Sequence, residues 1–585
     1  MLEHMAWKMP AMSQDLFTDA ILRFGVICPG YWWPEWQAVC LDKLLAVPMV
    51  EKALVILETD VGRKIQTARP ASGKAPQKSS LWQAYQKLRM HGTAMQRVDM
   101  RSTLRSVPDI QISGKTTENG RMVWDARTVE RVRSASLDFI LHFGDIALDA
   151  EPPGMTRYGI WQFFHGRRTR LPVCFDEMLH ENPVTEACLQ KLTENPHHRI
   201  TLRKGSFKTI LTSYTLSRNQ VLRESTVWPA QICLDIRHGI AKFSEVEPVA
   251  VTPTKTAPPS TSQMFRYIFK KTHHYATKLY RNLFIFDHWN IGLVQSPVNE
   301  FLKDNKSFPV NWLPDLPPNQ FRADPFVINR DEDVYIFFEN FDYKFAQGSI
   351  AYVVLGKDRP AEAKLVIAGY KHLSYPFLIE YEGEMYCVPE SSASGDVAIY
   401  RAINFPDEWI KAATLLPAFA GVDPTLFHYA EYWWLAATDR YDGPDYKLHL
   451  WYAKDLLGPW LPHHNNPVKM DICSARPAGT PFVFRNELYR PSQDCSKSYG
   501  NRIVLNRVRR LSPVAFEEEP ASMILPDSLS PDIDGTHTLC AAGQITLVDG
   551  KREEIALKSL AVLKYNVCYT LDNMLKKPAL RRGVR

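Results

Sequence analysis

Hydrophobic and polar residues alternate in two different ways along this chain. Between residues 20 and 244, short apolar runs alternate with stretches whose apolar residues recur at helical spacing, as in Ser80–Met90. Ile21–Cys28, Ala53–Leu57 and Leu137–Phe143 read as buried strands. Strands that alternate with helices predict a Rossmann-like α/β domain with a mainly parallel sheet over residues 20–244.

From Trp312 onward the pattern is that of short strands, and it repeats. A turn, a proline, an apolar strand and a second strand recur four times between residues 320 and 495. The prolines lie 51, 48 and 57 residues apart, and a period near fifty with several strands per unit predicts a β-propeller. A fifth unit at Asp534–Leu539 predicts five blades over residues 311–565, with Asn311–Pro318 helping to close the ring. The four prolines are Pro325, Pro376, Pro424 and Pro481.

The composition between and around these halves predicts their boundaries. Residues 245–263 are rich in proline and threonine, which predicts a linker that buries no core. Residues 264–310 are expected to form a helical connector, and the lysine-, serine- and glycine-rich residues 63–79 an exposed loop. Residues 1–19 are expected to be disordered, and residues 566–585 to form a basic tail.

The connector opens with an amphipathic pattern over Met264–Arg281, in which apolar residues at helical spacing are accompanied by five basic residues. A basic amphipathic helix can lie on an anionic membrane surface. It can also pack its apolar stripe on the neighbouring propeller, and we favour this second arrangement because such stripes usually face a core.

The bulk composition narrows the classes of partner. A chain of 585 residues with 23% charged residues and a net charge of +6 predicts two or three soluble domains, and the absence of a basic block argues against a nucleic-acid partner. The ten cysteines form no CxxC pairs, so neither a metal site nor a disulfide framework is expected, and no cofactor either. Reduced thiols, no secretory signal and no long apolar run favour a cytoplasmic protein.

The repeats place acidic residues at equivalent positions of successive units. The innermost strands of propeller blades begin at a shared axis, so Asp324, Tyr375 and Asp423, which precede the prolines, are expected to meet there. Converging carboxylates raise one another's pKa values and can supply the acid and the base that glycoside cleavage needs. An Asp-Pro pair at a strand start is equally typical of turn chemistry, and both interpretations stay open. Fourteen residues after the prolines stand Glu339, Glu390 and Thr438, and the shorter fourth unit places Gln493 and Asp494 there.

Asp324-Pro325-Phe326 and Asp423-Pro424-Thr425, on a five-bladed repeat, resemble the glycoside hydrolase superfamily of arabinanases, invertases and levansucrases. The resemblance implies that Asp324 is base or nucleophile and that Asp423 orients. The glutamic acid of the fourth blade is missing, and Arg476 stands near its place. We expect Glu390 to substitute as the acid.

Arginines accompany these carboxylates and either form ion pairs with them or clamp an anionic group of the substrate, because a guanidinium matches phosphate and carboxylate bidentately. The expected partner is a glycan or another sugar-containing substrate. The residues predicted to bind it are Arg476, Arg322, Glu339, Tyr375, Arg490, Asp494 and His537.

The order of motifs over residues 310–555 also resembles the propeller domain of plant glucosamine inositolphosphorylceramide transferases, whose separate transferase domain has no obvious counterpart here. This second resemblance implies a carbohydrate context. The motifs are Arg322–Glu339, Tyr375–Glu390, Asp423–Leu426, Arg476–Asp494 and Thr536–Leu539.

Residues 137–228 resemble the folate-dependent formyltransferases, with Tyr158–Gly166 in place of the active-site loop. Active members carry Asn-x-His in that loop and an aspartate before the last strand. Here Gln162, Phe164 and Asn182 replace those three residues, and His165 stands one residue late. A shift of one residue on a strand points a side chain to the other face. The resemblance therefore implies a degenerate domain that serves as a scaffold or binding module.

Together these features predict a carbohydrate-active protein of surface polysaccharide or glycolipid biosynthesis, whose propeller binds and cleaves or transfers a glycosyl unit. A non-catalytic glycan-binding or assembly scaffold is the alternative. Sugar N-formyl transfer is a third hypothesis, which requires His165 to re-enter the site.

Overall fold

A computed structural model describes residues 20–555 apart from 59–79, 90–92, 113, 118–120, 168, 170, 244–246, 249–256, 304–305, 318, 356–362 and 370. The predicted loop at 63–79 and the two terminal segments lie outside the described residues, as does much of the predicted linker. The chain divides into two compact units, which are described separately. The first comprises 1–180, 186–204 and 213–266, and the second 181–185, 205–212 and 267–585.

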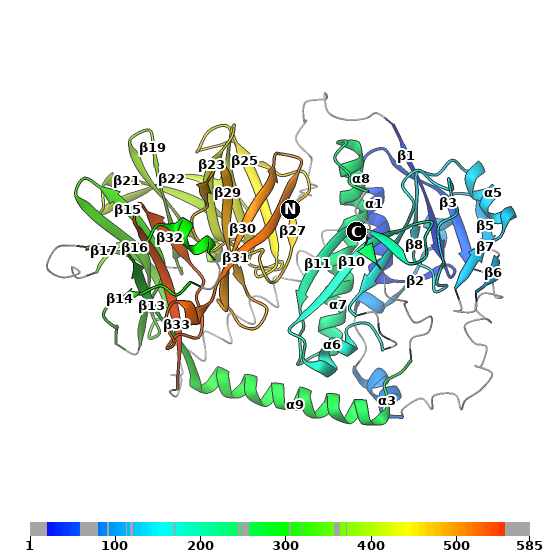
Figure 1. Cartoon of the computed structure of the whole chain (residues 1–585), viewed down its shortest axis with the longest axis horizontal. Helices are drawn as coiled ribbons and strands as arrows, with labels where there is room; N and C mark the ends of the chain where they lie inside the picture. Colours follow the sequence, from blue (N-terminus) through cyan, green and yellow to red (C-terminus); the bar gives the residue numbers. More distant parts are fainter. Residues whose placement is uncertain are drawn as a thin grey trace, which may run out of the picture. The chain divides into compact units, whose positions relative to one another are not determined.

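The N-terminal half is built on an eight-stranded mixed sheet flanked by helices, in the order β12-β11-β10-β9-β8-β1-β3-β5 (Figure 1). The five strands from β9 to β5 run parallel, and β10 is antiparallel to β9. The alternation of strands and helices predicts such an α/β sheet. Its strands are β1 (Leu22–Cys28), β3 (Val50–Glu58), β5 (Asp109–Ile112), β8 (Phe139–His142), β9 (Ile160–His165), β10 (Val184–Leu192), β11 (His198–Lys208) and β12 (Glu247–Pro248). Two further small pairs are β2 (Trp32–Pro34) with β4 (Arg97–Asp99), and β6 (Gly114–Thr116) with β7 (Met122–Trp124).

Two helices of this half begin where a side chain satisfies a free backbone donor. Asp125 accepts from the N–H of Thr128 and starts α5, and Ser213 accepts from the N–H of Leu216 and starts α7. The helices are α1 (Glu35–Leu45), α3 (Ser80–Arg89), α4 (Arg101–Leu104), α5 (Ala126–Ser134), α6 (Phe175–His180), α7 (Tyr214–Glu224) and α8 (Trp228–Arg237), with 3-10 turns η2 (Thr93–Met95) and η3 (Ser225–Val227).

The C-terminal half is a five-bladed propeller, as the repeats predict: its strands form five separate antiparallel sheets (Figure 1). Blade 1 is β15 (Gln320–Arg330), β16 (Asp333–Asp342), β17 (Gln347–Leu355) and β18 (Lys364–Ile367). Blade 2 is β19 (Ser374–Tyr381), β20 (Glu384–Glu390), β21 (Val397–Asn404) and β22 (Glu408–Leu416). Blade 3 is β23 (Gly421–Tyr429), β24 (Tyr432–Asp439), β25 (Lys447–Ala453), β26 (Leu461–Pro462) and β27 (Lys469–Met470). Blade 4 is β28 (Phe482–Phe484), β29 (Glu487–Asp494), β30 (Arg502–Leu511) and β31 (Phe516–Ile524).

Blade 5 joins the two ends of the propeller. Its inner strands β32 (Leu539–Ala542) and β33 (Ile545–Ile555) continue outward into β13 (Ile285–Val294) and β14 (Asn311–Trp312). β13 pairs with β33 over ten residues, from Ile285 opposite Ile555 to Val294 opposite Thr546. The propeller therefore begins at β13, and the boundary predicted at residue 311 is corrected: the ring is closed by a strand that lies inside the expected connector. Short 3-10 turns are η4 (Val298–Leu302), η5 (Ser392–Ser394) and η6 (Pro526–Ser528).

Hydrogen bonds between the starts of the inner strands close the ring at its centre. Each blade is linked there to another blade through side chains or backbone at the same phase of the repeat, which is what a radial arrangement of similar sheets requires. The bonds are Thr538 Oγ1 to Asp324 Oδ1 (2.8 Å), Tyr375 N to Asp324 Oδ2 (3.3 Å), Tyr375 Oη with Thr425 Oγ1 (2.8 Å), Gly479 N to Tyr375 Oη (2.6 Å) and Thr480 N to Leu539 O (3.0 Å).

The connector contains one long helix, α9 (Thr261–Phe284). Met264 and Tyr267 are buried, but the apolar side chains of the predicted stripe are exposed: Phe265 is 62% and Phe269 75% accessible to solvent. The arrangement favoured from the sequence, with this stripe packed on the propeller, is therefore wrong. Among the described helices, none is long and apolar enough to cross a membrane.

Candidate functional site

Three blades present a strained residue at the same place. Asp324, Tyr375 and Asp423 have left-handed φ angles of 53°, 46° and 49°, and each lies at a β-bulge where the pairing of the first two strands shifts register. A non-glycine residue in this conformation costs roughly 1–2 kcal/mol. Bulges re-aim side chains, and such strain is concentrated at functional sites. The three side chains that the sequence places at the axis are held there against local backbone preference.

Asp324 lies at the junction of blades 1, 2 and 5. Its Oδ1 accepts the hydroxyl of Thr538, and its Oδ2 accepts the N–H of Tyr375. The Nε2 atom of His537 is 3.5 Å from Oδ1. Burial, reinforced by the charges of Asp423 and Asp549 and opposed by His537, raises the pKa of Asp324 to about 6. This carboxyl group can thus change protonation close to neutral pH.

His537 bridges two carboxylates. Its Nδ1 lies 2.6 Å from Oδ2 of Asp549, and its ring stacks on Trp289 with the ring centres 4.0 Å apart. Burial lowers the pKa of His537, but the charges of Asp549 and Asp324 outweigh that effect and raise it. Asp549 also accepts the backbone N–H groups of His537 and Thr538, so it holds the segment that carries the imidazole in position.

The same three side chains are the group among the described residues whose donor atoms fit a cation. One ligand atom each from Asp324, His537 and Asp549 lies within 4.8 Å of the others. In this group the imidazole of His537 lies between the two carboxylates, 2.6 Å from Asp549 and 3.5 Å from Asp324.

Asp423 is paired with an arginine. Arg476 donates from Nε to Oδ2 of Asp423 (2.6 Å) and from Nη1 to Asp445 (3.1 Å), and its guanidinium lies over the ring of Tyr499. Gln493 donates to the same Oδ2 at 2.8 Å. Burial raises the pKa of Asp423 to about 6, although Arg476 lowers it. Two donors thus fix the carboxylate of Asp423, whose expected orienting role stays a prediction.

The two glutamates of the second phase also reach this centre. Glu390 accepts the N–H of Asp423 (3.1 Å) and the hydroxyl of Ser392 (2.7 Å). Burial and then the charges of Asp324, Glu390 and Asp423 raise the pKa of Glu339 well above its usual range. Glu339, which the sequence analysis expected to bind substrate, is therefore a carboxyl group that favours its protonated form.

His372 supports this protonated glutamate. Its Nδ1 accepts the N–H of Gly348 (3.0 Å), so in the neutral ring the proton is on Nε2, which lies 3.5 Å from Oε1 of Glu339. Burial lowers the pKa of His372 to about 4, so the ring is neutral at pH 7.

Tyr375 links three blades through a directed chain of hydrogen bonds. Its hydroxyl accepts the N–H of Gly479 and donates to Thr425, whose hydroxyl donates to the carbonyl of Asp423. The side chain is fully buried. Tyr375 therefore positions the bulge of Asp423, and its predicted role in binding substrate is replaced by a structural one.

Three residues predicted to bind substrate lie elsewhere. Arg490 is buried in blade 4, where it pairs with Glu518 and donates to the carbonyls of Ser474 and Ala475. Asp494 accepts from Arg502 and the N–H of Ser496. Neighbouring residues on a strand point to opposite faces, so Gln493, and not Asp494, reaches the axis.

Arg322 is the third such residue. It donates to the carbonyl of Pro314 and lies over the ring of Phe338, and Asp315 is the carboxylate whose charge raises its pKa against the effect of burial. These contacts are with Pro314, Phe338 and Asp315 and not with the central carboxylates.

Two central residues were missed from the sequence, Asp549 and Trp289. Asp549 stands on β33, the second strand of blade 5, and so corresponds to Glu339 and Glu390 of the other blades. The hairpin of blade 5 is shorter than those of the first three blades. An alignment of the repeats that allows gaps would have matched the alternating run before Asp549 to the second strands of those blades. Trp289 comes from β13, outside the repeats.

The residues of the degenerate formyltransferase motif lie on or beside strands. Tyr158–Gly166, expected to be a loop, contains strand β9 with Gln162 and Phe164, and Asn182 precedes β10. His165 shares its face with Phe163, since both rings contact Trp36, and its Nε2 is 2.9 Å from the hydroxyl of Ser225. Burial lowers the pKa of His165 to about 3, so it is a neutral core histidine.

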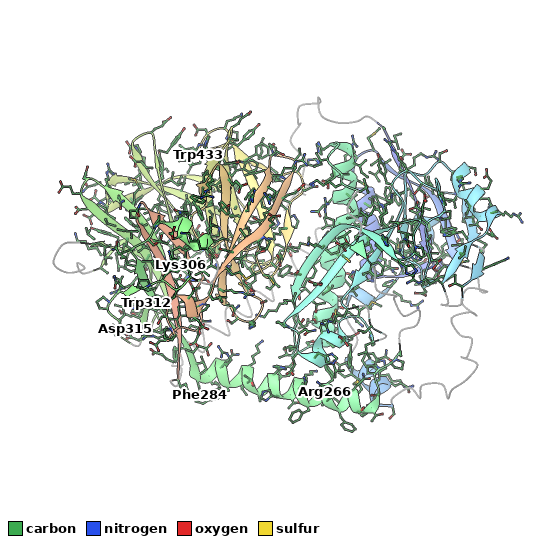
Figure 2. The ribbon with its side chains drawn as sticks, in the orientation of Figure 1. Arg266, Phe284, Lys306, Trp312, Asp315 and Trp433 are labelled. Atoms are coloured by element: carbon green, nitrogen blue, oxygen red, sulfur yellow. The ribbon has the colours of Figure 1, made fainter. Side chains whose placement is uncertain are left out.

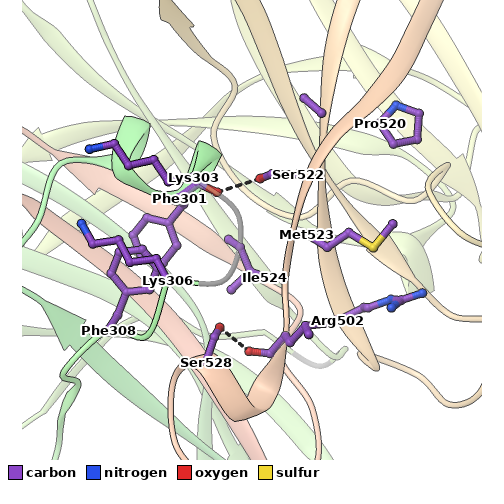
Figure 3. A pocket seen from close by; sticks show the side chains of 12 residues that line it. Phe301, Lys303, Lys306, Phe308, Arg502, Pro520, Ser522, Met523, Ile524 and Ser528 are labelled. Atoms are coloured by element: carbon purple, nitrogen blue, oxygen red, sulfur yellow. Dashed lines mark hydrogen bonds between the residues drawn. The ribbon is translucent and has the colours of Figure 1, made fainter.

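A cavity of about 410 Å³ lies at the outer edge of blade 4, between η4 and β31 (Figure 3). Lys303 and Lys306 on its rim both pair with Glu300, and Arg502 pairs with Asp494. Its cations are neutralised and the axial carboxylates do not line it, so we do not assign the chemistry to this cavity.

The raised pKa of Glu339 predicts a pH-dependent stability. The unfolded glutamate loses its proton near pH 4.5 while the folded one keeps it, so the free energy of unfolding that this group supplies is present at low pH and lost as the pH rises. A tenfold difference in proton affinity between the folded and unfolded states corresponds to about 1.4 kcal/mol. We expect Glu339→Gln to match the wild type at pH 4 and to exceed its stability at pH 8, measured by chemical denaturation. Equal pH curves for both proteins would contradict the assignment, and Glu332→Gln, at an exposed turn of the same blade, is the control.

The known proteins that are similar in sequence match this chain in its propeller. Residues 314–530 match the family described as "Glucosamine inositolphosphorylceramide transferase 1, N-terminal". The glucosamine inositolphosphorylceramide transferases 1 of Oryza sativa subsp. japonica and Arabidopsis thaliana are each 35% identical to this chain, over 214 and 210 residues. These matches cover 35% and 34% of this chain but only 28% and 27% of the relatives, so the chain spans less than a third of their length.

Solved structures with a similar chain trace include glycoside hydrolases. A family 117 glycoside hydrolase, Zg3597 of Zobellia galactanivorans, is 16% identical with a TM-score of 0.30 and covers 47% of this chain and 91% of its own. An α-L-arabinanase of Cellvibrio cellulosa in complex with arabinohexaose is 12% identical with a TM-score of 0.27 and covers 34% and 77%. The resemblance to formyltransferases stays a prediction. In its propeller, this chain is similar to the N-terminal part of the glucosamine inositolphosphorylceramide transferases, as the order of its motifs indicates.

Proposed function

We propose that this protein acts on a carbohydrate at the propeller axis, where it binds a glycosyl unit of a glycolipid or surface polysaccharide and cleaves or transfers it. The observation that carries the proposal is the convergence of Asp324, Asp423 and Glu390 from separate blades, together with pKa values near 6 for both aspartates. A reaction at a glycosidic bond needs one protonated and one ionised carboxyl group, and this cluster supplies groups of both kinds. The similarity to transferases named for inositolphosphorylceramide supports a glycolipid substrate.

Individual roles follow from the local contacts. Asp324, held by Thr538 and next to the imidazole of His537, is the candidate base or nucleophile. Asp423, fixed by Arg476 and Gln493, orients. Glu390 stays the candidate acid, and the strongly protonated Glu339 is a second proton donor.

A non-catalytic glycan-binding scaffold is favoured by a different observation. The three carboxyl-bearing residues are only 4%, 2% and 8% exposed, in the order Asp324, Asp423 and Glu390. Asp423 also forms an ion pair with Arg476, as a purely structural aspartate does. Sugar N-formyl transfer has no such support, because His165 is a neutral, buried side chain bonded to Ser225.

A screen of the full chain against glycolipids, free glycans and sugar nucleotides separates these functions. Turnover by the wild type that disappears in Asp324→Asn while binding persists supports catalysis at the axis. Binding without turnover in both proteins supports the scaffold. Turnover that survives in the variant rejects the assignment of Asp324.

Arg476 is proposed to contact an anionic group of the substrate, because its Nη2 makes only a long 3.5 Å contact with the hydroxyl of Tyr499. We expect Arg476→Lys to weaken binding of an anionic glycan by about tenfold, since lysine cannot form the planar bidentate contact. Binding of a neutral glycan should change far less. Calorimetry on both ligands is the measurement, with Arg509→Lys in blade 4, an exposed ion-paired arginine, as control. An equal loss for both ligands would mean that Arg476 acts only through Asp423.

A further inference from the structure

Helix α9 (Thr261–Phe284) presents its apolar side to solvent. At about 100° per residue, eight of its apolar residues form a stripe roughly 140° wide along the helix, whereas Met264 and Tyr267 lie outside the stripe and are buried. The large side chains of the stripe are exposed, apart from the half-buried Leu283, and Figure 2 shows the helix with Arg266 and Phe284 labelled toward its two ends. The stripe consists of Phe265, Ile268, Phe269, Tyr275, Ala276, Leu279, Tyr280 and Leu283.

The polar side of the helix, by contrast, is attached to the protein. Glu181 accepts from Lys270 and, at 2.9 Å, from His274, and Arg281 forms a two-point ion pair with Glu553. These contacts fix the rotation of the helix about its axis. The apolar stripe therefore points away from the surface to which the polar side is bound.

The charge of the helix selects the occupant of that stripe. Among its 24 residues there are five arginines and lysines and no acidic residue. Arg266 borders one edge of the stripe, and Lys271 and Lys278 border the other. Two copies of such a helix would repel each other if their stripes paired, whereas an anionic lipid surface would attract the basic borders and accept the apolar side chains.

We propose that α9 is an interfacial helix that docks this protein on an anionic membrane surface, with Phe265, Phe269 and Leu279 inserted at the headgroup boundary. The proposal is independent of the chemistry at the propeller axis. Large exposed apolar patches on soluble proteins mark interaction sites, and here the charge pattern indicates a lipid partner.

Vesicle cosedimentation with the full chain tests the proposal. We expect at least tenfold stronger binding to phosphatidylcholine vesicles that contain about 30% phosphatidylserine than to phosphatidylcholine alone, and weaker binding at high salt. The double variant Phe265→Ser/Phe269→Ser should lose roughly tenfold or more in affinity, because it removes two buried aromatic anchors. Arg266→Glu/Lys278→Glu should abolish the preference for anionic vesicles.

Phe345→Ser is the matched control, since Phe345 is an equally exposed phenylalanine in a turn of the propeller. Vesicle binding that is absent in the wild type, or equal in wild type and serine double variant, overturns the proposal. So does a drop of the melting temperature by several degrees in the double variant, which would show that the stripe is packed in the protein. A wild-type dimer in sedimentation that this variant converts to a monomer would identify a second copy as the occupant and also overturn it.

Discussion

The Asp324→Asn variant is expected to lose between about a hundredfold and ten-thousandfold in turnover of the glycosyl substrate, while its affinity for that substrate changes by less than about threefold. Asparagine keeps the size of the side chain, and its one oxygen can still accept the hydroxyl of Thr538, although its Nδ2 cannot accept the N–H of Tyr375. It can neither take up a proton nor attack a sugar carbon. The loss should therefore appear in kcat and not in KM.

The pH profile of turnover by the wild type gives a second test of the role of Asp324. Because the pKa of Asp324 is raised to about 6, turnover that depends on its ionised form should fall as the pH drops below about 6. Asp333→Asn, at the exposed end of a strand in the same blade, is the control and should behave as the wild type. An Asp324→Asn protein with full activity, or a wild type whose profile is flat from pH 5 to 8, would refute the role of Asp324.

The Arg490→Met variant is expected to lose about 3–5 kcal/mol in the free energy of unfolding. Arg490 and its partner Glu518 are almost completely buried, and the guanidinium also satisfies the carbonyls of Ser474 and Ala475. Its removal leaves the Glu518 carboxylate in the protein interior with Lys469 as its remaining partner. The cost of an incompletely paired buried charge dominates the effect.

Chemical denaturation of three proteins checks this assignment. The double variant Arg490→Met/Glu518→Met should recover much of the lost stability, because it removes both charges together. Arg507→Met, which breaks an exposed pair with Glu487, should cost less than about 1 kcal/mol. A stable Arg490→Met protein that has lost affinity for anionic glycans would restore the substrate-binding role first predicted for Arg490.

The repeat carries most of what can be read from the sequence. In the first three units the residue before the proline lies at the bulge, so Asp324 and Asp423 could be placed without any structure, and His537 follows from the fifth unit. This works because a period of about fifty residues returns the chain to the same radial position. The N-terminal strands are also readable, since buried parallel strands form continuous apolar runs such as Leu22–Cys28.

The errors have equally local causes. The fourth unit is two residues shorter up to strand β29, so the repeat could not show whether Gln493 or Asp494 points to the axis. A shift of one residue moves a side chain to the other face of a strand. Asp549 escaped notice because its hairpin is shorter. The stripe of α9 could not be assigned to core or surface, because a helical period reports only that one side is apolar and not what covers it.

The ladder between β13 and β33 has a consequence for the order in which the protein matures. Blade 5 cannot assemble until the ribosome has delivered residues 545–555, whose partner strand was synthesised more than two hundred residues earlier. Until then Asp324 has neither Thr538 nor His537 beside it, and the centre of the nascent propeller lacks the contacts that blade 5 supplies. A stop codon just before residue 545 should consequently yield a product that proteases clear, rather than a shortened propeller with four working blades.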